Sequence, residues 1–240
     1  MAAPEALIAA HRAQQDRLSA ATTGFVKQLF ADMFAVTALT PSWQQLEPLL
    51  VALVQQRRQI SAGLASNFVA AFRASLGVSG RYVPDVPGVA LADDIVPWLR
   101  AAGPSTAIDL FNAGRAAEVA SLTLDSVNGS VVRMVLDGGR DVAASTAERD
   151  PKCVGYQRHA SGACCAFCAM LTTRVYRSKA TAGEGADWHT DCNCTVVPVY
   201  RDSQPQPDNT TRYRDLWNES TRGLSGNDAR LAFRRAIEGR

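Results

Sequence analysis

The chain has 240 residues, of which 47% are hydrophobic and 20% are charged, and its formal net charge is +2. This is the composition of a globular protein that can bury a core, in one large or two small domains. The charge is too small to indicate nucleic-acid or membrane binding by bulk electrostatics. No apolar run is long enough to cross a bilayer, and the N-terminus lacks the pattern of a secretory signal.

Helical periodicity dominates the first 150 residues. Apolar residues three and four apart predict an N-terminal helix that includes residues 23–34. A longer helix is expected to begin at Thr40-Pro41-Ser42, with Pro41 in the first turn and Ser42 forming a capping-box pattern with Gln45, and to be ended by Gly77 to Gly80. One face of this helix carries four apolar residues spaced four apart: Ile60, Leu64, Phe68 and Phe72.

Residues 81–94 contain two prolines and a glycine, so we expect an irregular connector there. Helical patterning returns at Ile95 and again at Pro104. It is expected to stop at Gly138-Gly139, because glycine commonly ends a helix. A further short helix over residues 140–150 would complete the helical part of the chain.

The character of the sequence changes at Cys153. Residues 153–158, 174–178 and 194–201 have the composition of short strands and are separated by turn-forming residues. Pro198 lies inside the last of these segments. Because proline cannot donate to a strand ladder, that strand is predicted to lie at a sheet edge or to carry a bulge.

The predicted fold class is therefore α+β, with three parts. A mainly helical body takes residues 1–150, and a small Cys/His-rich β-subdomain takes residues 151–201. Residues 202–240 are expected to form a polar linker, rich in proline and glutamine, followed by a C-terminal helical arm.

All six cysteines lie within residues 153–194. Cys165 and Cys168 form a C-x-x-C pair, and His189 and Cys192 form an H-x-x-C pair. Zinc takes four such ligands at the corners of a tetrahedron, usually as two short-spaced pairs. In a reducing cytoplasm, clustered cysteines are more often metal ligands or catalytic groups than disulfides. These four residues are therefore predicted to bind a structural zinc ion.

The remaining cysteines leave alternatives open. Cys194 could replace Cys192, because residues two apart on an extended segment face the same way. Cys164 should point away from the ion that Cys165 binds, and Cys153 is expected to be buried. Two other interpretations are reduced cysteines packed without a metal, and redox or disulfide chemistry. The redox interpretation lacks the strand–helix–strand unit in which a thioredoxin-like pair opens a helix.

The cysteine segment resembles a known family. "CCAFCAMLTTRVYRS" followed by "WHTDCNCTVVPVY" is similar to the C-terminal signature of MuF-like phage head morphogenesis proteins. "RRQISAGLASNFVAAFRASLGVSG", "VVRMVLDGGRDV" and "TRGLSGNDARLAFRRA" resemble proteins of tailed actinobacteriophages encoded just after the portal protein. Such proteins are commonly labelled MuF-like minor capsid protein or capsid maturation protease. The resemblance extends from about Ala9 to the C-terminus.

This resemblance implies a role in phage head assembly in the host bacterial cytoplasm, inside or at the portal end of the procapsid. The partners would be the portal protein, the scaffold or the major capsid protein, and no membrane would be involved. The family signature falls on five residues of this chain: Cys165, Cys168, His189, Cys192 and Cys194. Where relatives often read RG-x-VY, this chain reads TRVYRS without the glycine, so the local turn is expected to differ.

The protease label requires a nucleophile, a base and a group that orients the base. Of the three histidines, His11 is expected to face solvent, and His189 to bind metal or to pack beside Trp188. His159 is left as a base, with Ser161 or Cys164 as the nucleophile. Such close neighbours in one loop rarely reach each other, and neither G-x-S-x-G nor H-E-x-x-H occurs. We therefore assign no catalytic residue and expect a structural head protein, with a maturation protease as the alternative.

Contact with DNA is a third hypothesis. The C-terminal arm carries seven arginines, but four acidic residues are interspersed among them, which is typical of a solvated helical face. The arginines are Arg212, Arg214, Arg222, Arg230, Arg234, Arg235 and Arg240, and the acids are Asp215, Glu219, Asp228 and Glu238.

Overall fold

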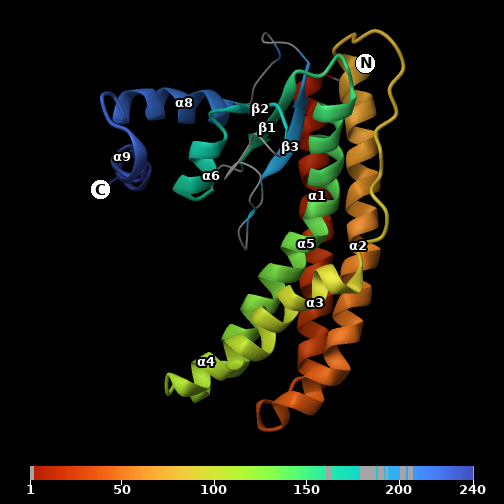
Figure 1. Cartoon of the computed structure of the whole chain (residues 1–240), viewed down its shortest axis with the longest axis vertical. Coiled ribbons are helices and arrows are strands. Elements are labelled where there is room, and N and C mark those ends of the chain that lie inside the picture. Colours follow the sequence, from red (N-terminus) through yellow and green to blue (C-terminus); the bar gives the residue numbers. More distant parts are fainter. Residues whose placement is uncertain are drawn as a thin grey trace.

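The computed structural model describes residues 3–160, 164–178, 188, 192, 194–200, 204 and 208–239. Within these residues the chain is mostly helical, with a single three-stranded antiparallel sheet in the order β2-β1-β3 (Figure 1). The predicted α+β class is therefore confirmed. None of the described helices combines the length and the apolar character that crossing a lipid bilayer requires.

Three long helices form the body of the protein. They are α1 (Pro4–Met33), α2 (Leu39–Ser75) and α5 (Val119–Arg149), and they run side by side in Figure 1. Their apolar faces meet in one core, because residues three and four apart on each helix lie on the same side. This core includes Val26, Phe30, Leu46, Leu50, Leu53, Val54, Val127, Val131 and Val135.

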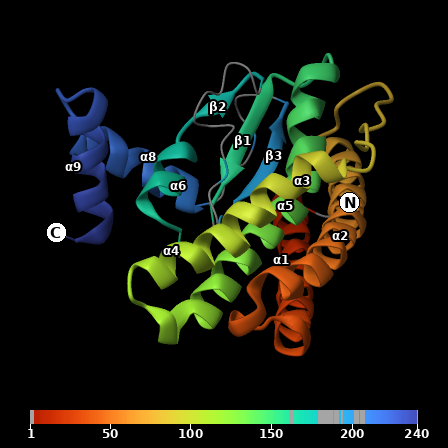
Figure 2. The same cartoon turned by 60° about the horizontal axis from the view of Figure 1, so that its bottom comes forward.

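Shorter helices cover part of the body beside α5. They are α3 (Ala92–Arg100) and α4 (Thr106–Asn112), joined by a π-helical turn (Ala101–Ser105), and both lie against α5 (Figure 2). Single 3₁₀ turns, Val36–Ala38 and Ala116–Glu118, precede α2 and α5. The predicted connector, residues 81–94, contains no helix or strand as far as Leu91, but its last three residues belong to α3.

The long helix α2 begins at Leu39, one residue before the predicted start at Thr40. Pro41 lies in its first turn, where a missing backbone N–H breaks no helical hydrogen bond. Ser42 is therefore inside the helix, and its hydroxyl donates to the Leu39 carbonyl at 3.0 Å instead of capping the end. The expected capping box with Gln45 is wrong for this reason.

The expected helix end at Gly138-Gly139 is also wrong, because α5 continues to Arg149. The two glycines permit close packing of α5 on α2. A Cβ atom at Gly138 would overlap the backbone carbonyl oxygen of Arg58. The Gly139 N–H donates to the Ser61 hydroxyl at 3.1 Å. The helix expected at residues 140–150 is therefore the last part of α5.

The sheet consists of β1 (Gly155–His159), β2 (Val175–Tyr176) and β3 (Thr195–Val199). β3 pairs only with β1 among the described strands, with Pro198 opposite Tyr156, so the predicted edge position of the proline is confirmed. The sheet shares a core with the helical body, made by Phe68, Phe72, Ala143, Ala144, Tyr156, Val196 and Val197. The division of the chain into the three predicted parts stays a prediction.

Three helices lie beside the sheet, on the side away from α2. They are α6 (Ala166–Leu171), α8 (Asp208–Ser220) and α9 (Gly226–Glu238), and α8 and α9 both pack against α6 (Figures 1 and 2). Their common core contains Cys168, Met170, Leu171, Tyr213 and Phe233. The C-terminal arm is thus packed on α6, and α8 begins inside the predicted linker.

Gly138→Ala is expected to lower the free energy of unfolding by about 1–3 kcal/mol, because overlap with Arg58 outweighs the better helix propensity of alanine. Gly63→Ala in α2 is the matched control, since no atom outside its own helix lies within 4 Å of the added methyl group. It should raise stability by up to about 1 kcal/mol. Urea unfolding of both variants measures the difference, and equal effects would contradict close packing at Gly138.

Candidate metal centre

Two segments bring cysteine sulfurs together. Cys168 lies in α6, whose first turn is fixed by a hydrogen bond from the Cys168 N–H to the Cys165 sulfur at 3.4 Å. Cys192 and Cys194 lie just before β3, which is held at the sheet edge by its pairing with β1. The arrangement therefore depends on the position of α6 relative to the sheet.

The sulfur atoms of Cys168, Cys192 and Cys194 all lie within 4.8 Å of one another. We call these residues the thiol trio. The Cys168 and Cys192 sulfurs are 3.7 Å apart, which is close to the edge of about 3.8 Å that a zinc–thiolate tetrahedron with Zn–S bonds of about 2.3 Å would have. The three residues are only 2%, 2% and 5% exposed. Their spacing and chemistry can hold a metal ion out of contact with solvent.

The electrostatics of the trio favour one thiolate. Hydrogen bonds from Cys168 and then Cys194 lower the pKa of Cys192, and the charge of Arg140 lowers it further. Hydrogen bonding to Cys192 raises the pKa of Cys168. The pKa of Cys194 is raised to about 12: the Cys168 hydrogen bond lowers it, but the Cys192 hydrogen bond and burial outweigh that effect. A metal ion would replace the protons that Cys168 and Cys194 retain.

Cys194, which the sequence suggested as a substitute for Cys192, lies beside it in the trio. Cys165 is exposed and is not a member of the trio. His189, the other predicted ligand, lies outside the described residues, as does Ser161. The structure thus brings together two of the four predicted ligands, Cys168 and Cys192, and the alternative ligand Cys194.

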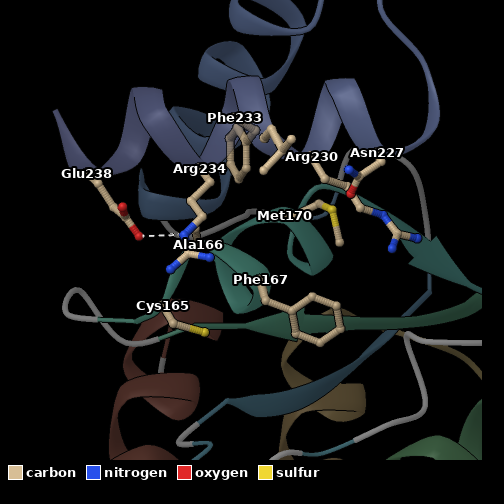
Figure 3. A pocket seen from close by; sticks show the side chains of 10 residues that line it. Cys165, Ala166, Phe167, Met170, Asn227, Arg230, Phe233, Arg234 and Glu238 are labelled. Atoms are coloured by element: carbon tan, nitrogen blue, oxygen red, sulfur yellow. Dashed lines mark hydrogen bonds and ion pairs between the residues drawn. The ribbon is translucent and has the colours of Figure 1, made fainter. Parts of the chain in front are cut away.

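Cys165 lines a pocket of about 380 Å³ between α6 and α9 (Figure 3). Apolar side chains from both helices form much of its wall, including Phe167, Met170 and Phe233. Arg234 also lines it and pairs with Glu238 at 2.8 Å. The pocket is separate from the buried trio.

The other two cysteines contact neither each other nor the trio by hydrogen bonds. The Cys153 thiol donates to the carbonyls of Gly155 at 3.1 Å and Val199 at 3.3 Å, and burial raises its pKa to about 11. The Cys164 thiol donates to the Tyr213 hydroxyl at 3.5 Å, and burial raises its pKa as well. Neither thiol is activated as a nucleophile.

The histidines do not provide an activated base in the described residues. His159 is fully buried, and neither of its ring nitrogens has a hydrogen-bond partner among them. Burial and then the charge of Arg12 lower its pKa to about 3. His11, expected at the surface, is also buried because its ring stacks on Phe68 at 4.5 Å. That expectation is wrong.

Sequence reasoning missed the surroundings of the trio. Arg140 from α5 and Arg158 from β1 lie over the ring of Trp188 at 4.2 Å and 3.8 Å, and Arg158 approaches the Cys192 sulfur at 3.4 Å. An arginine in a helix or strand is usually exposed, so no local pattern marked these two as buried. Only the position of Trp188 beside the H-x-x-C motif pointed to this region.

The model of the VG15 protein family matches residues 2–220, which is most of the chain. The chain therefore belongs to the VG15 family and is a phage protein. A search of curated proteins and a search of solved structures each found no match.

Acid is expected to destabilise the protein below pH 6.5. The pKa of His11 is about 4 and that of His159 about 3 in the folded state, against 6.5 for an unperturbed histidine, so the unfolded state binds more protons as pH falls. The free energy of unfolding therefore decreases as the pH falls from about 6.5 toward the folded-state pKa values of the two histidines. Each histidine should contribute a loss of about 2 kcal/mol between pH 7 and pH 5.

His11→Phe separates this effect from other titrations, because it keeps an aromatic ring on Phe68 and removes the ionisable group. Its free energy of unfolding should fall by about 2 kcal/mol less than that of the natural chain over the same range. Urea unfolding at both pH values measures this. Identical pH dependence in the two proteins would show that His11 is not held neutral by burial.

Proposed function

We propose that this phage protein is a structural protein of head morphogenesis, a MuF-like minor capsid protein that acts in procapsid assembly at or near the portal. Membership of the VG15 family supports its phage origin. The place in the head rests on the resemblance of residues 164–200 to the MuF-like signature. In this proposal the Cys/His-rich segment folds around a structural zinc ion.

The observation that carries the structural role is the burial of the thiol trio. A catalytic zinc keeps one position open to water or substrate, whereas a structural zinc is enclosed by protein ligands. Thiolates favour zinc and other soft ions over magnesium or calcium. The trio would supply three ligands, and Cys165 and His189 are the sequence candidates for the fourth. Such an ion would contribute folding free energy to a segment with few strands.

A capsid maturation protease is not favoured by any described residue. His159 is buried, and its ring nitrogens bond to no nucleophile among the described residues. Co-expression with the phage's scaffold and major capsid proteins tests this alternative directly. Cleavage of either protein that depends on the presence of this chain would support proteolysis and contradict a purely structural role.

Purified protein is expected to contain about one zinc ion per chain. Cys168→Ser should remove most of the zinc and lower the unfolding temperature, because it deletes a ligand from the trio. Cys153→Ser is the matched control, since its sulfur bonds to carbonyls outside the trio, and it should retain the metal. Elemental analysis and thermal unfolding measure both effects. A fully folded, metal-free natural protein would contradict the zinc proposal.

Association with the portal is the test of the place in assembly. When the chain is co-expressed with the portal protein of the same phage, the two should purify together. Quantitative mass spectrometry of procapsids and mature particles should then give the copy number relative to the portal. The head-assembly proposal would be contradicted if the chain were absent from procapsids and did not associate with the portal, scaffold or capsid proteins.

A further inference from the structure

Helix α5 holds the segment that supplies two sulfurs of the trio. Arg133 donates to the Trp188 carbonyl at 3.3 Å. Arg140 donates to the carbonyl of Cys194 at 3.4 Å and to that of Cys192. The two arginines are seven residues apart, about two helical turns, and so lie on one face of α5. This face therefore binds three backbone carbonyls of one short segment.

Two buried arginines, Arg140 and Arg158, also lie beside the trio. Arg140 is 4% exposed and Arg158 is 0% exposed. Their guanidinium groups both lie over the ring of Trp188, and Arg158 donates to the Cys192 sulfur at 3.4 Å. Burial of a cation costs several kcal/mol unless opposite charge or hydrogen bonds compensate it. Asp137 pairs with Arg140 at 2.9 Å, and the Arg158 guanidinium donates to the Cys192 sulfur.

The third sulfur belongs to a different unit. Cys168 lies in α6 and packs in the same core as Tyr213 of α8 and Phe233 of α9. The C-terminal end of α6 is held to the sheet by hydrogen bonds from Gln157 to the Thr172 carbonyl and from Tyr176 to the Leu171 carbonyl. An ion bound by the trio would add a connection from α6 to the segment that α5 holds.

We propose that the metal–thiolate centre is the joint that fixes α6, and with it α8 and α9, to α5, and that Arg140 and Arg158 compensate the negative charge of its thiolates. The proposal rests on the metal centre of the proposed function. A divalent ion with three or four thiolates carries net negative charge, which favours adjacent cations in a buried site. The arginines act on the metal through the sulfurs and the backbone, and are positioning residues.

The charge part of the proposal is tested by zinc affinity, measured by competition with a chromophoric chelator. Arg158→Met should weaken zinc binding about 10- to 100-fold, as loss of groups that support metal ligands commonly does. Arg158→Lys restores the charge and should recover most of the affinity. Arg57→Met is the matched control, because Arg57 also lies over an aromatic ring, that of Phe25, but contacts neither the trio nor the segment that carries it. It should change the affinity by less than about threefold.

Circular dichroism shows whether each variant is folded, and Arg158→Gln replaces Arg158→Met if the latter is not. The thiolate-to-cobalt absorption of the Co²⁺-loaded variants reports whether the same sulfurs still bind. A folded neutral variant that binds zinc as tightly as the natural chain would overturn the charge compensation. A natural chain that binds no zinc would instead remove the metal centre itself, which is a failure of the proposed function.

The joint is tested by hydrogen exchange of the natural chain with zinc and after its removal by a chelator. Metal removal should accelerate amide exchange in α6, α8 and α9 more than in α1 and α2, which share a separate core. Equal exchange in α8 and α9 with and without zinc, in a protein shown to bind zinc, would overturn the joint and leave the metal centre in place.

Discussion

The approach of three buried sulfurs is the interaction that brings α6 next to the segment before β3. Cys168 comes from a short helix, and Cys192 and Cys194 come from the segment before an edge strand. Neither element is long enough to be stable alone, since α6 has six residues and β3 has five. The sulfurs meet because α6 packs on α8 and α9 while β3 packs on the helical body.

The helical body provides the rigid side of this arrangement. Gly138 and Gly139 let the backbone of α5 pack directly against α2. This close packing fixes the orientation of the α5 face that carries Arg133 and Arg140. Those arginines bind the carbonyls of Trp188, Cys192 and Cys194. The packing of two long helices thus determines where the cysteine segment lies. A structural metal would use this scaffold and would not need to organise the segment by itself.

Much of the secondary structure could be predicted from local pattern. Helical spacing of apolar residues indicated α2, and Pro198 indicated an edge strand, because both signals depend on local backbone chemistry. The glycine pair at residues 138 and 139 led to a wrong prediction of a helix end. Glycine ends helices but also permits close packing between helices, and only the position of the neighbouring helix distinguishes the two uses. The predicted exposure of His11 was wrong for a similar reason, because its burial depends on Phe68, which is distant in sequence.

The sequence by itself determined the α+β class, the segment that contains the cysteines and the chemistry those cysteines can perform. These follow from composition, periodicity and spacing, which are properties of neighbouring residues. The tertiary structure decided which sulfurs meet, that Cys165 lines a different pocket, and that Arg140 and Arg158 are buried beside the trio. Such facts depend on contacts between residues far apart in the chain, and the position of α6 against the sheet sets them.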